Sequence, residues 1–321
     1  MFQGPSRTID HPSAAPGCRC GPSTAASVPA PERAVRLQHP SRTIGQVPPL
    51  RVVQISDTHL SHRRAYAVPN VRAVLAWLRD APPDLVVHTG DITADDPDDD
   101  EEATFAQELL TGAGLPLVVI PGNHDVGGFS GDRFTADRLA AFEARWGEDT
   151  WSQDLGVWRL IGANVYRLLE DDHDGWLASA LATDRPTALF LHQPICLVDP
   201  DVADGGDWSV PMPRRRRLLE LMAGRPIKVV ASGHLHRYNT GALPSGPVTV
   251  WGPAASFIGS QRPDGSTYRV GVVEHLLGAD GHASHRLVEP AGVTLLRLED
   301  LVPPKSESLR DADVLPLAAV S

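Results

Sequence analysis

Imidazole and carboxylate side chains recur in this sequence directly after short apolar runs, and those runs predict buried strands. The residues that follow the five runs are Asp57 and His59, Asp91, Asn123 and His124, His192, and His234 with His236. A single Asp or His at a strand end is usually a turn or cap residue. Because the pattern recurs at five equivalent positions, we expect these side chains to form one site.

The chemical types of these residues predict a metal centre. Imidazole and carboxylate donors without cysteine suit Mn, Fe or Zn better than Ca or a structural zinc. The set is too large for one ion, and a carboxylate such as Asp91 can bridge two, which predicts a two-metal centre. Residues i and i+2 of an extended segment point the same way, so Asp57 and His59 can converge on one ion. By the same spacing, His234 and His236 can reach two neighbouring ions.

The apolar runs alternate with helical patterns in the first third of the chain. Strands are predicted at residues 50–56, 85–88 and 117–120, and apolar residues with helical spacing lie at 71–79 and 105–110. This order predicts a parallel sheet covered by helices. Ligands of such sheets bind beyond the carboxyl ends of the strands, where the candidate residues lie.

Further strands are predicted at residues 157–161, 187–191 and 227–231, with helices near 133–145 and 214–221. After His236 the pattern changes, and short apolar runs are separated by Gly and Pro turns. These runs, such as 247–251 and 270–274, predict antiparallel hairpins in a second sheet.

The composition is that of a globular protein with loose ends. The chain has 321 residues, of which 42% are hydrophobic and 21% charged. Residues 1–47 are dense in Pro, Ser, Ala and Arg and lack periodicity, which predicts a disordered extension. We expect residues 48–300 to form one domain and residues 301–321 to form a C-terminal tail.

Charge and cysteine content restrict the partners and the compartment. Net charge is −11; residues 1–47 contribute +3, so the remainder carries −14, which disfavours binding to a nucleic acid backbone. Cys18, Cys20 and Cys196 are sparse and odd in number, which suits a reducing cytosol. No apolar run approaches the ~20 residues of a membrane span, and no secretory signal is recognised. A cytoplasmic location is therefore expected.

The motifs as a set resemble a known family. In order and type, they match the five motifs of the calcineurin-like metallophosphoesterases: Asp57-x-His59, Gly90-Asp91, Gly122-Asn123-His124-Asp125, His192 and Gly233-His234-x-His236. The match covers roughly residues 50–260. The opening at residues 56–60 and the ending at residues 232–236 are most similar to the bacterial class III cyclic-nucleotide phosphodiesterase branch.

The resemblance implies a ligand set and a fold. One ion would be held by Asp57, His59, Asp91 and His236, and the other by Asp91, Asn123, His192 and His234. In this scheme His124 is not a ligand: it would stabilise or protonate the leaving oxygen, and Asp125 would orient it. The implied fold is a four-layer α/β/β/α sandwich of two mixed β-sheets flanked by helices.

The implied activity is a dinuclear metal-dependent hydrolysis of phosphoric esters. Cyclic nucleotides or similar small phosphodiesters are the expected substrates, attacked in line by a hydroxide that bridges two ions, with Mn or Fe favoured and Zn an alternative. A phosphomonoesterase, a DNA-repair-type nuclease and a non-catalytic scaffold are the competing interpretations. A scaffold would be expected to lack ligands, and none is missing. A homodimer is compatible with the sequence, which does not fix the oligomeric state.

Other polar residues are weaker candidates. His62 and Asn164 are considered as substrate contacts, with a loop surface and a turn as the alternatives. His88 is expected to be a core histidine. The run Arg214 to Arg217 predicts a solvated helix face. Four further histidines have no motif context and are expected at the surface: His173, His275, His282 and His285.

Overall fold

The computed structural model describes residues 48–94, 98–128, 134–204, 206–259 and 265–301. The predicted extension at 1–47, with Cys18 and Cys20, and the tail from 302 onward lie outside these residues. Within the described ranges, no helix combines the length and the apolar character needed to cross a membrane.

The described elements alternate between strands and helices through most of the chain. The strands are β1 Leu50–Ile55, β2 Leu85–His88, β3 Leu117–Val119, β4 Trp151–Leu155, β5 Trp158–Gly162, β6 Thr187–Leu191, β7 Ile227–Ser232, β8 Asn239–Ala242, β9 Val248–Trp251, β10 Val272–Leu277 and β11 Ala283–Val288. The helices are η1 Ala65–Ala67, α1 Val68–Asp80, α2 Asp100–Thr111, α3 Asn123–Val126, α4 Ala136–Trp146, η2 Val165–Arg167, α5 Asp171–Ala180, α6 Met212–Met222 and α7 Leu298–Leu301.

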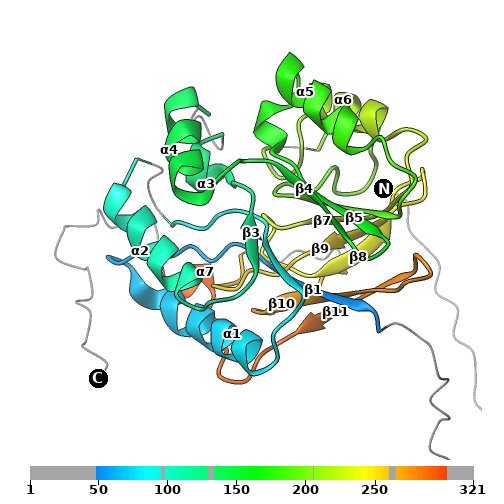
Figure 1. The fold of residues 1–321 in the computed structure, drawn as a ribbon. Coiled ribbons are helices and arrows are strands. Elements are labelled where there is room, and N and C mark those ends of the chain that lie inside the picture. The colour runs from blue at the N-terminus through cyan, green and yellow to red at the C-terminus, as the bar shows by residue number, and fades with distance from the viewer. Residues whose placement is uncertain (1–47, 95–97, 129–133, 205, 260–264, 302–321) are drawn as a thin grey trace, which may run out of the picture. The chain divides into compact units, whose positions relative to one another are not determined.

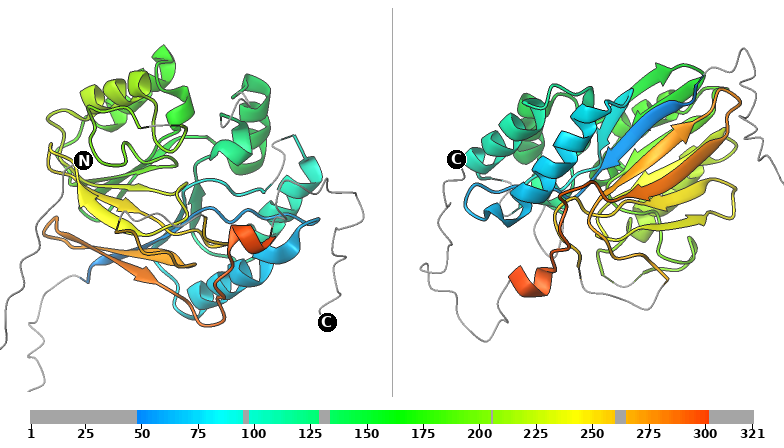
Figure 2. Two further views of the ribbon diagram at one scale, coloured as in Figure 1. Left: turned by 180° about the vertical axis from the view of Figure 1, so that it is seen from behind. Right: turned by 90° about the horizontal axis from the view of Figure 1, so that it is seen from below.

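Two mixed sheets form the centre of the described domain (Figure 1). The first has the order β11-β10-β1-β2-β3, in which β1, β2 and β3 are parallel and β10 runs antiparallel to β1. The second has the order β4-β5-β6-β7-β9-β8, with a parallel centre and antiparallel edges at β4 and β8. Figure 2 shows the sheets and the flanking helices from two further sides. The predicted four-layer sandwich is confirmed.

Alternation along the strands separates the layers of the core. Val52 of β1 packs with Phe190 of β6 and Val229 of β7 in a cluster between the two sheets. The next residue, Val53, points the other way and belongs to a cluster with Val74 of α1. Because successive side chains of a strand face opposite sides, each inner strand supplies both layers.

The acidic run before α2 has the predicted helix-start function. The side chain of Asp99 accepts a hydrogen bond from the backbone N–H of Glu102, and Asp100, Glu101 and Glu102 lie in the first turn. Carboxylates at this end of a helix satisfy free N–H groups and complement the helix dipole. Of this run, residues 95–97 lie outside the described residues.

The C-terminal hairpin differs from its prediction. Strands β8 and β9 do join the second sheet, but β10 and β11 return to the first, where β10 pairs with β1 (Figure 1). A hairpin pattern shows which strands are neighbours along the chain, but it does not say which sheet edge they will meet. Strand β4 was also absent from the prediction, because Ser152, Gln153 and Asp154 interrupt its apolar pattern.

Three residues that were predicted at the surface are buried. His173 and His275 are 2% and 1% exposed. His275 lies on the face of β10 that Val273 and Leu277 turn toward the second sheet, so alternation buries it. Arg215, predicted on a solvated helix face, is 1% exposed, because four consecutive helical residues point in different directions and one of them faces the core.

Candidate metal centre

The predicted ligands lie in loops that follow strands of both sheets. Asp57 and His59 follow β1, Asp91 follows β2, and Asn123 begins the short helix α3 after β3. The second sheet supplies three histidines: His192 follows β6, and His234 and His236 follow β7. The sandwich thus brings residues from distant parts of the chain to the same end of the two sheets, as predicted.

The backbone at these positions is unusual. Five of the candidate ligands are non-glycine residues with positive φ: Asp57, His59, Asp91, His234 and His236, at 52°, 41°, 54°, 69° and 52°. Such conformations cost about 1–3 kcal/mol each, and they cluster at functional sites. Asp57 and His59 do lie close together, but not because the segment is extended, as the sequence analysis expected. Left-handed backbone conformations bring them together.

Two glycines permit the close approach of these loops. A Cβ on Gly122 would lie 2.2 Å from Oδ1 of Asp91. A Cβ on Gly233 would lie 1.8 Å from Oγ of Ser56 and 2.6 Å from Oδ2 of Asp57. The Gly that precedes Asn123 and the Gly that precedes His234 therefore have a steric reason to be in the motifs.

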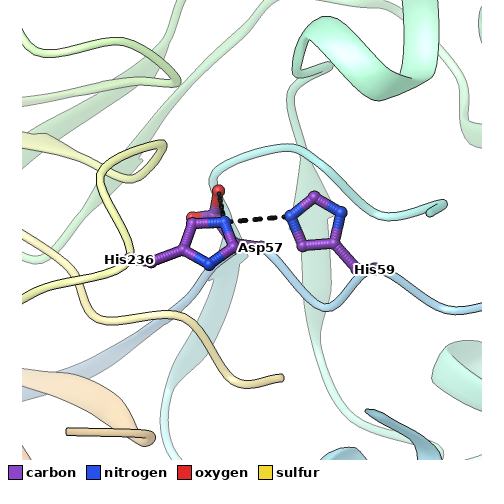
Figure 3. A group of neighbouring side chains, drawn as sticks. All are labelled: Asp57, His59 and His236. Atoms are coloured by element: carbon purple, nitrogen blue, oxygen red, sulfur yellow. Dashed lines mark hydrogen bonds and ion pairs between the residues drawn. The ribbon is translucent and has the colours of Figure 1, made fainter. Parts of the chain in front are cut away.

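The first ligand group consists of Asp57, His59 and His236 (Figure 3). The Nε2 atoms of His59 and His236 lie 3.0 Å apart, and Nε2 of His236 lies 3.4 Å from Oδ1 of Asp57. On the far side of its ring, Nδ1 of His236 donates to the carbonyl oxygen of Phe257 at 2.9 Å. A carbonyl only accepts, so this bond leaves the Nε2 lone pair of His236 facing the group.

The second group consists of Asp91, His192 and His234, with Asn123 beside it. Nε2 of His192 lies 3.1 Å from Nδ1 of His234, 3.1 Å from Oδ1 of Asn123 and 3.4 Å from Oδ1 of Asp91. The outward nitrogens again donate to backbone carbonyls: Nδ1 of His192 to Thr89 at 2.7 Å, and Nε2 of His234 to Asp207 at 2.9 Å.

Asp91 stands between the two groups. Its Oδ1 faces His192 of the second group, and its Oδ2 lies 3.8 Å from Nε2 of His59 in the first. A third set of neighbouring donor atoms, from His59, Asp91 and His124, overlaps both. This is the placement that the sequence predicts for a bridging carboxylate.

The donor atoms of these groups fit cations. Ring nitrogens that face each other at 3.0–3.1 Å need a proton or another cation between them, because two lone pairs repel. Burial alone would lower the pKa of His192, but the charge of Asp91 and its hydrogen bond outweigh burial and raise it to about 9. Burial would raise the pKa of Asp57, whereas His236 lowers it well below its usual range. The site thus attracts positive charge although it is shielded from solvent.

His124 lies at the edge of the cluster, half-buried and perpendicular to His59, with ring centroids 4.7 Å apart. Its backbone N–H donates to Oδ1 of Asp91 at 2.9 Å, which fixes α3 against the bridging carboxylate. The imidazole has a nitrogen near donor atoms of His59 and Asp91, and it lies outside the group of Asp57, His59 and His236 and the group of Asp91, His192 and His234. This position suits a group that acts on a bound ligand.

Asp125 does not contact the imidazole of His124. Its carboxylate instead accepts hydrogen bonds from the backbone N–H groups of Ile92, Thr93 and Gly122, at 2.8–3.2 Å, and from Oγ1 of Thr93 at 3.1 Å. Burial and the neighbouring Asp91 raise the pKa of Asp125 to about 6, although the hydrogen bonds to its carboxylate act to lower this pKa. In place of the predicted contact with the His124 imidazole, the carboxylate of Asp125 forms hydrogen bonds that join the loop after β2 to the loop after β3.

The weaker candidates lie outside the cluster. His62 has Nε2 3.6 Å from Oε2 of Glu101 and contacts the ring of Phe105, at the start of α2. Asn164 is buried: its Nδ2 donates to Asp149 and its Oδ1 accepts from the backbone of Tyr166. His88 is a core histidine, as expected, with Nε2 3.0 Å from Oγ1 of Thr58.

Sequence reasoning missed three aromatic neighbours of the cluster. The rings of Phe257, Tyr166 and Trp208 lie 5.1 Å from His59, 6.5 Å from His192 and 6.2 Å from His234, respectively. None stands in a motif or in a periodic segment. The signal available was only that Trp208 lies in a Gly- and Asp-rich loop, where a large apolar side chain has no core to fill.

Comparisons with known proteins agree with the geometry. A probable cyclic nucleotide phosphodiesterase of Synechococcus sp. is 28% identical over 209 residues, covering 60% of this chain and 76% of that protein. A probable glycerophosphodiester phosphodiesterase of Arcobacter nitrofigilis is 29% identical over 212 residues, covering 59% and 72%. A purple acid phosphatase from yellow lupin shares the fold with a TM-score of 0.57 and 15% identity, covering 78% of this chain and 54% of its own.

The fold and the paired donor groups define the class of the metallophosphoesterases, which hydrolyse phosphoric esters. The calcineurin-like phosphoesterase family matches residues 50–238, and the chain belongs to this family. It is therefore a phosphoric ester hydrolase, and its fold implies two divalent metal ions, for which the described residues supply candidate ligands.

Proposed function

We propose that this chain is a phosphodiesterase for cyclic nucleotides or similar small phosphodiesters. The observation that carries the proposal is the pair of donor groups on either side of Asp91, with His124 at their edge. Relatives named as probable phosphodiesterases of cyclic nucleotides and of glycerophosphodiesters, matched over about three fifths of this chain, support the diester class. The acidic body disfavours a nuclease.

The proposed ligands are assigned to two ions in the way that the family motifs imply. Asp57, His59 and His236 would hold one ion, and Asn123, His192 and His234 the other, with Asp91 shared. Two such ions would activate a water as the nucleophile and offset charge on the phosphoryl oxygens. Imidazole and carboxylate donors favour Mn or Fe, with Zn as the alternative.

The chain's own groups supply the remaining chemistry. The His124 imidazole would stabilise or protonate the leaving oxygen, because it lies beside the ligand groups and an imidazole can donate a proton. Asp125 would position this residue indirectly, through the backbone of the two loops that it joins. The carbonyl oxygens of Thr89, Asp207 and Phe257 would keep three imidazoles in the tautomer that ligates a cation.

A cytoplasmic location and a small-molecule substrate complete the proposal. Cys196, the cysteine within the described residues, is free, which suits a reducing compartment. Whether the protein acts as a monomer or as a homodimer does not alter the site, since every proposed ligand comes from one chain.

A substrate panel tests the proposed function. Protein loaded with Mn²⁺ should hydrolyse 3′,5′-cAMP, 2′,3′-cAMP or a glycerophosphodiester faster than phosphomonoesters, as measured by product chromatography. Activity on monoesters with failure on all the diesters would overturn the substrate class. Protein with no bound transition metal and no hydrolysis of bis(p-nitrophenyl) phosphate after Mn²⁺ addition would favour a non-catalytic scaffold.

A further inference from the structure

An exposed tryptophan stands beside the candidate metal centre. The indole of Trp208 lies 6.2 Å from the ring of His234, and the residue is 36% exposed. Phe257 and Tyr166, which also contact histidines of the cluster, are 5% and 2% exposed. Of these three aromatic neighbours, Trp208 is the one that is exposed rather than buried.

The loop that carries Trp208 is held by a buried arginine. Nη2 of Arg215 donates to Oδ2 of Asp204 at 2.7 Å and to Oγ of Ser209 at 2.9 Å, and Nη1 donates to the carbonyl of Val202 at 2.7 Å. Oγ of Ser209 also donates to Asp204 at 2.6 Å. These bonds tie Val202 and Asp204, which precede Trp208, and Ser209, which follows it, to one buried side chain.

The position of the indole is also tied to the cluster itself. The carbonyl oxygen of Asp207, the preceding residue, accepts from Nε2 of His234 and from Nε2 of Gln193, both at 2.9 Å. Gly206 lies against the indole: a Cβ added there would lie 3.3 Å from its Cδ1 and Nε1 atoms. The glycine has φ of +73°, so the turn that supports the ring is one that other residues rarely adopt.

We propose that Trp208 is a specificity-determining residue whose indole stacks on the base of a nucleotide substrate held by its phosphate at the metal centre. The inference rests on the proposed function for the phosphate site and deepens it, because it selects nucleoside esters among the phosphodiesters. In a nucleotide only the ribose separates phosphate from base. A base can therefore reach an indole that lies one imidazole ring away from the cluster.

Stacking explains why an exposed aromatic ring would be useful here. An aromatic platform binds every base through its π-face, and loss of such a platform weakens binding by about 5- to 150-fold per base. A glycerophosphodiester has no ring to stack, so it gains nothing from the indole. Trp208 would thus act on substrate choice and leave the chemical step to the cluster.

The test compares ligands that differ only in the base. Binding of AMP and of ribose 5-phosphate to the Mn²⁺-loaded full chain is measured by titration calorimetry, for the unaltered protein and for Trp208→Ala, Trp208→Phe and Val198→Ala. Val198 is the control, because it lies on the same loop and is 91% exposed. We expect AMP to bind at least about 10-fold more tightly than ribose 5-phosphate, a preference lost in Trp208→Ala and kept in Trp208→Phe and Val198→Ala.

Equal binding of the two ligands by the unaltered protein, or a preference that survives in Trp208→Ala, would overturn the inference. Kinetics separates it from the proposed function. The inference expects Trp208→Ala to raise KM for 3′,5′-cAMP and not for glycerophosphocholine. If both substrates are cleaved and this selective rise in KM is absent, the inference fails, but the proposed phosphodiesterase activity stands. If no diester is cleaved but the AMP preference depends on Trp208, the proposed function fails while the stacking role stands.

Discussion

The Nε2 atoms of His59 and His236 lie 3.0 Å apart, with the second nitrogen of His236 bonded to the carbonyl of Phe257. The His236 bond directs a lone pair inward, toward a neighbour that also presents a nitrogen. Two such rings beside the carboxylate of Asp57 form a site whose donors are set before any ion enters. Preorganised donors of this kind should couple metal binding to stability.

Metal removal should therefore lower the melting temperature. At an ion concentration 100 times the dissociation constant, one site adds about 2.7 kcal/mol to the free energy of unfolding. Dialysis against EDTA should remove this contribution, and Mn²⁺ should restore it, as followed by differential scanning calorimetry with elemental analysis.

Substitution of single residues should separate ligands from other groups. His236→Ala and Asn123→Ala should each weaken the binding of one ion, whereas His124→Ala should keep both ions bound. Loss of either ion in His124→Ala would show instead that His124 is a ligand.

His124→Ala should slow the cleavage of poor leaving groups. An alkoxide needs the proton that an imidazole supplies, so we expect a loss of about 10²- to 10⁴-fold in kcat on an alkyl phosphodiester. A p-nitrophenyl ester, whose phenolate leaves without protonation, should lose much less. Steady-state kinetics on the two substrates at one pH measures the difference. Equal losses on both would exclude the role of His124 as an acid.

Asp125→Asn should act differently from His124→Ala. The carboxylate of Asp125 accepts from the N–H groups of Ile92, Thr93 and Gly122, and an amide NH₂ cannot accept. We expect the free energy of unfolding to fall by about 1–3 kcal/mol, from the bonds left unpaired. Activity should fall by similar factors on good and poor leaving groups, because the loops that carry Asp91 and His124 shift together. Loss confined to poor leaving groups would restore a direct action on His124.

The proximity of the candidate ligands could be predicted because each lies directly after a strand whose apolar pattern is clear. Carboxyl ends of neighbouring parallel strands meet at one edge, so the order of the motifs was enough to place Asp57 beside Asp91. The partners of Asp125 could not be predicted, because Ile92 and Gly122 come together only after the two loops pack. That contact depends on tertiary structure that no local pattern encodes.

The same limit applies to the rest of the fold. The sheet that receives β10 is decided by which edge lies uncovered beside β1, and a hairpin pattern does not contain that information. Trp208 lies 26 residues before His234 in a loop without periodicity, and it comes beside that candidate ligand only in the folded chain. His275 is the exception: alternation with Val273 and Leu277 could have placed it in the core.

Tyr166→Phe should leave the protein as stable as before or more stable by about 1 kcal/mol. Within the described residues, the hydroxyl of Tyr166 is buried and has no hydrogen-bond partner, so its removal costs no bond and relieves a desolvated group. Burial, and then the nearby Asp91, raise the pKa of this phenol, so it is neutral. Urea unfolding measures the change. A fall of more than about 10-fold in kcat, with stability kept, would indicate instead that the hydroxyl contacts the substrate.

Glu274→Gln should reduce stability at neutral pH but not in acid. The buried carboxylate of Glu274 accepts from Nε of Arg51 at 2.6 Å and from Nε of Arg286 at 2.5 Å, between β1 and β11. Burial would raise the pKa of Glu274, but the bonds from Arg286 and Arg51 outweigh it and lower the pKa. The native state therefore binds this proton less readily than the unfolded chain does.

The sign of the pH dependence follows from that difference. Stability from a carboxylate with a lowered folded pKa is fully present above its unfolded pKa, near 4.5, and is lost as pH falls through the folded pKa. We expect Glu274→Gln to cost about 1–3 kcal/mol at pH 7, and the difference from the unaltered protein to shrink below about pH 4. Urea unfolding of both proteins between pH 7 and pH 3 measures it. A difference that stays constant over this range would show that the glutamate acts by packing rather than by its charge.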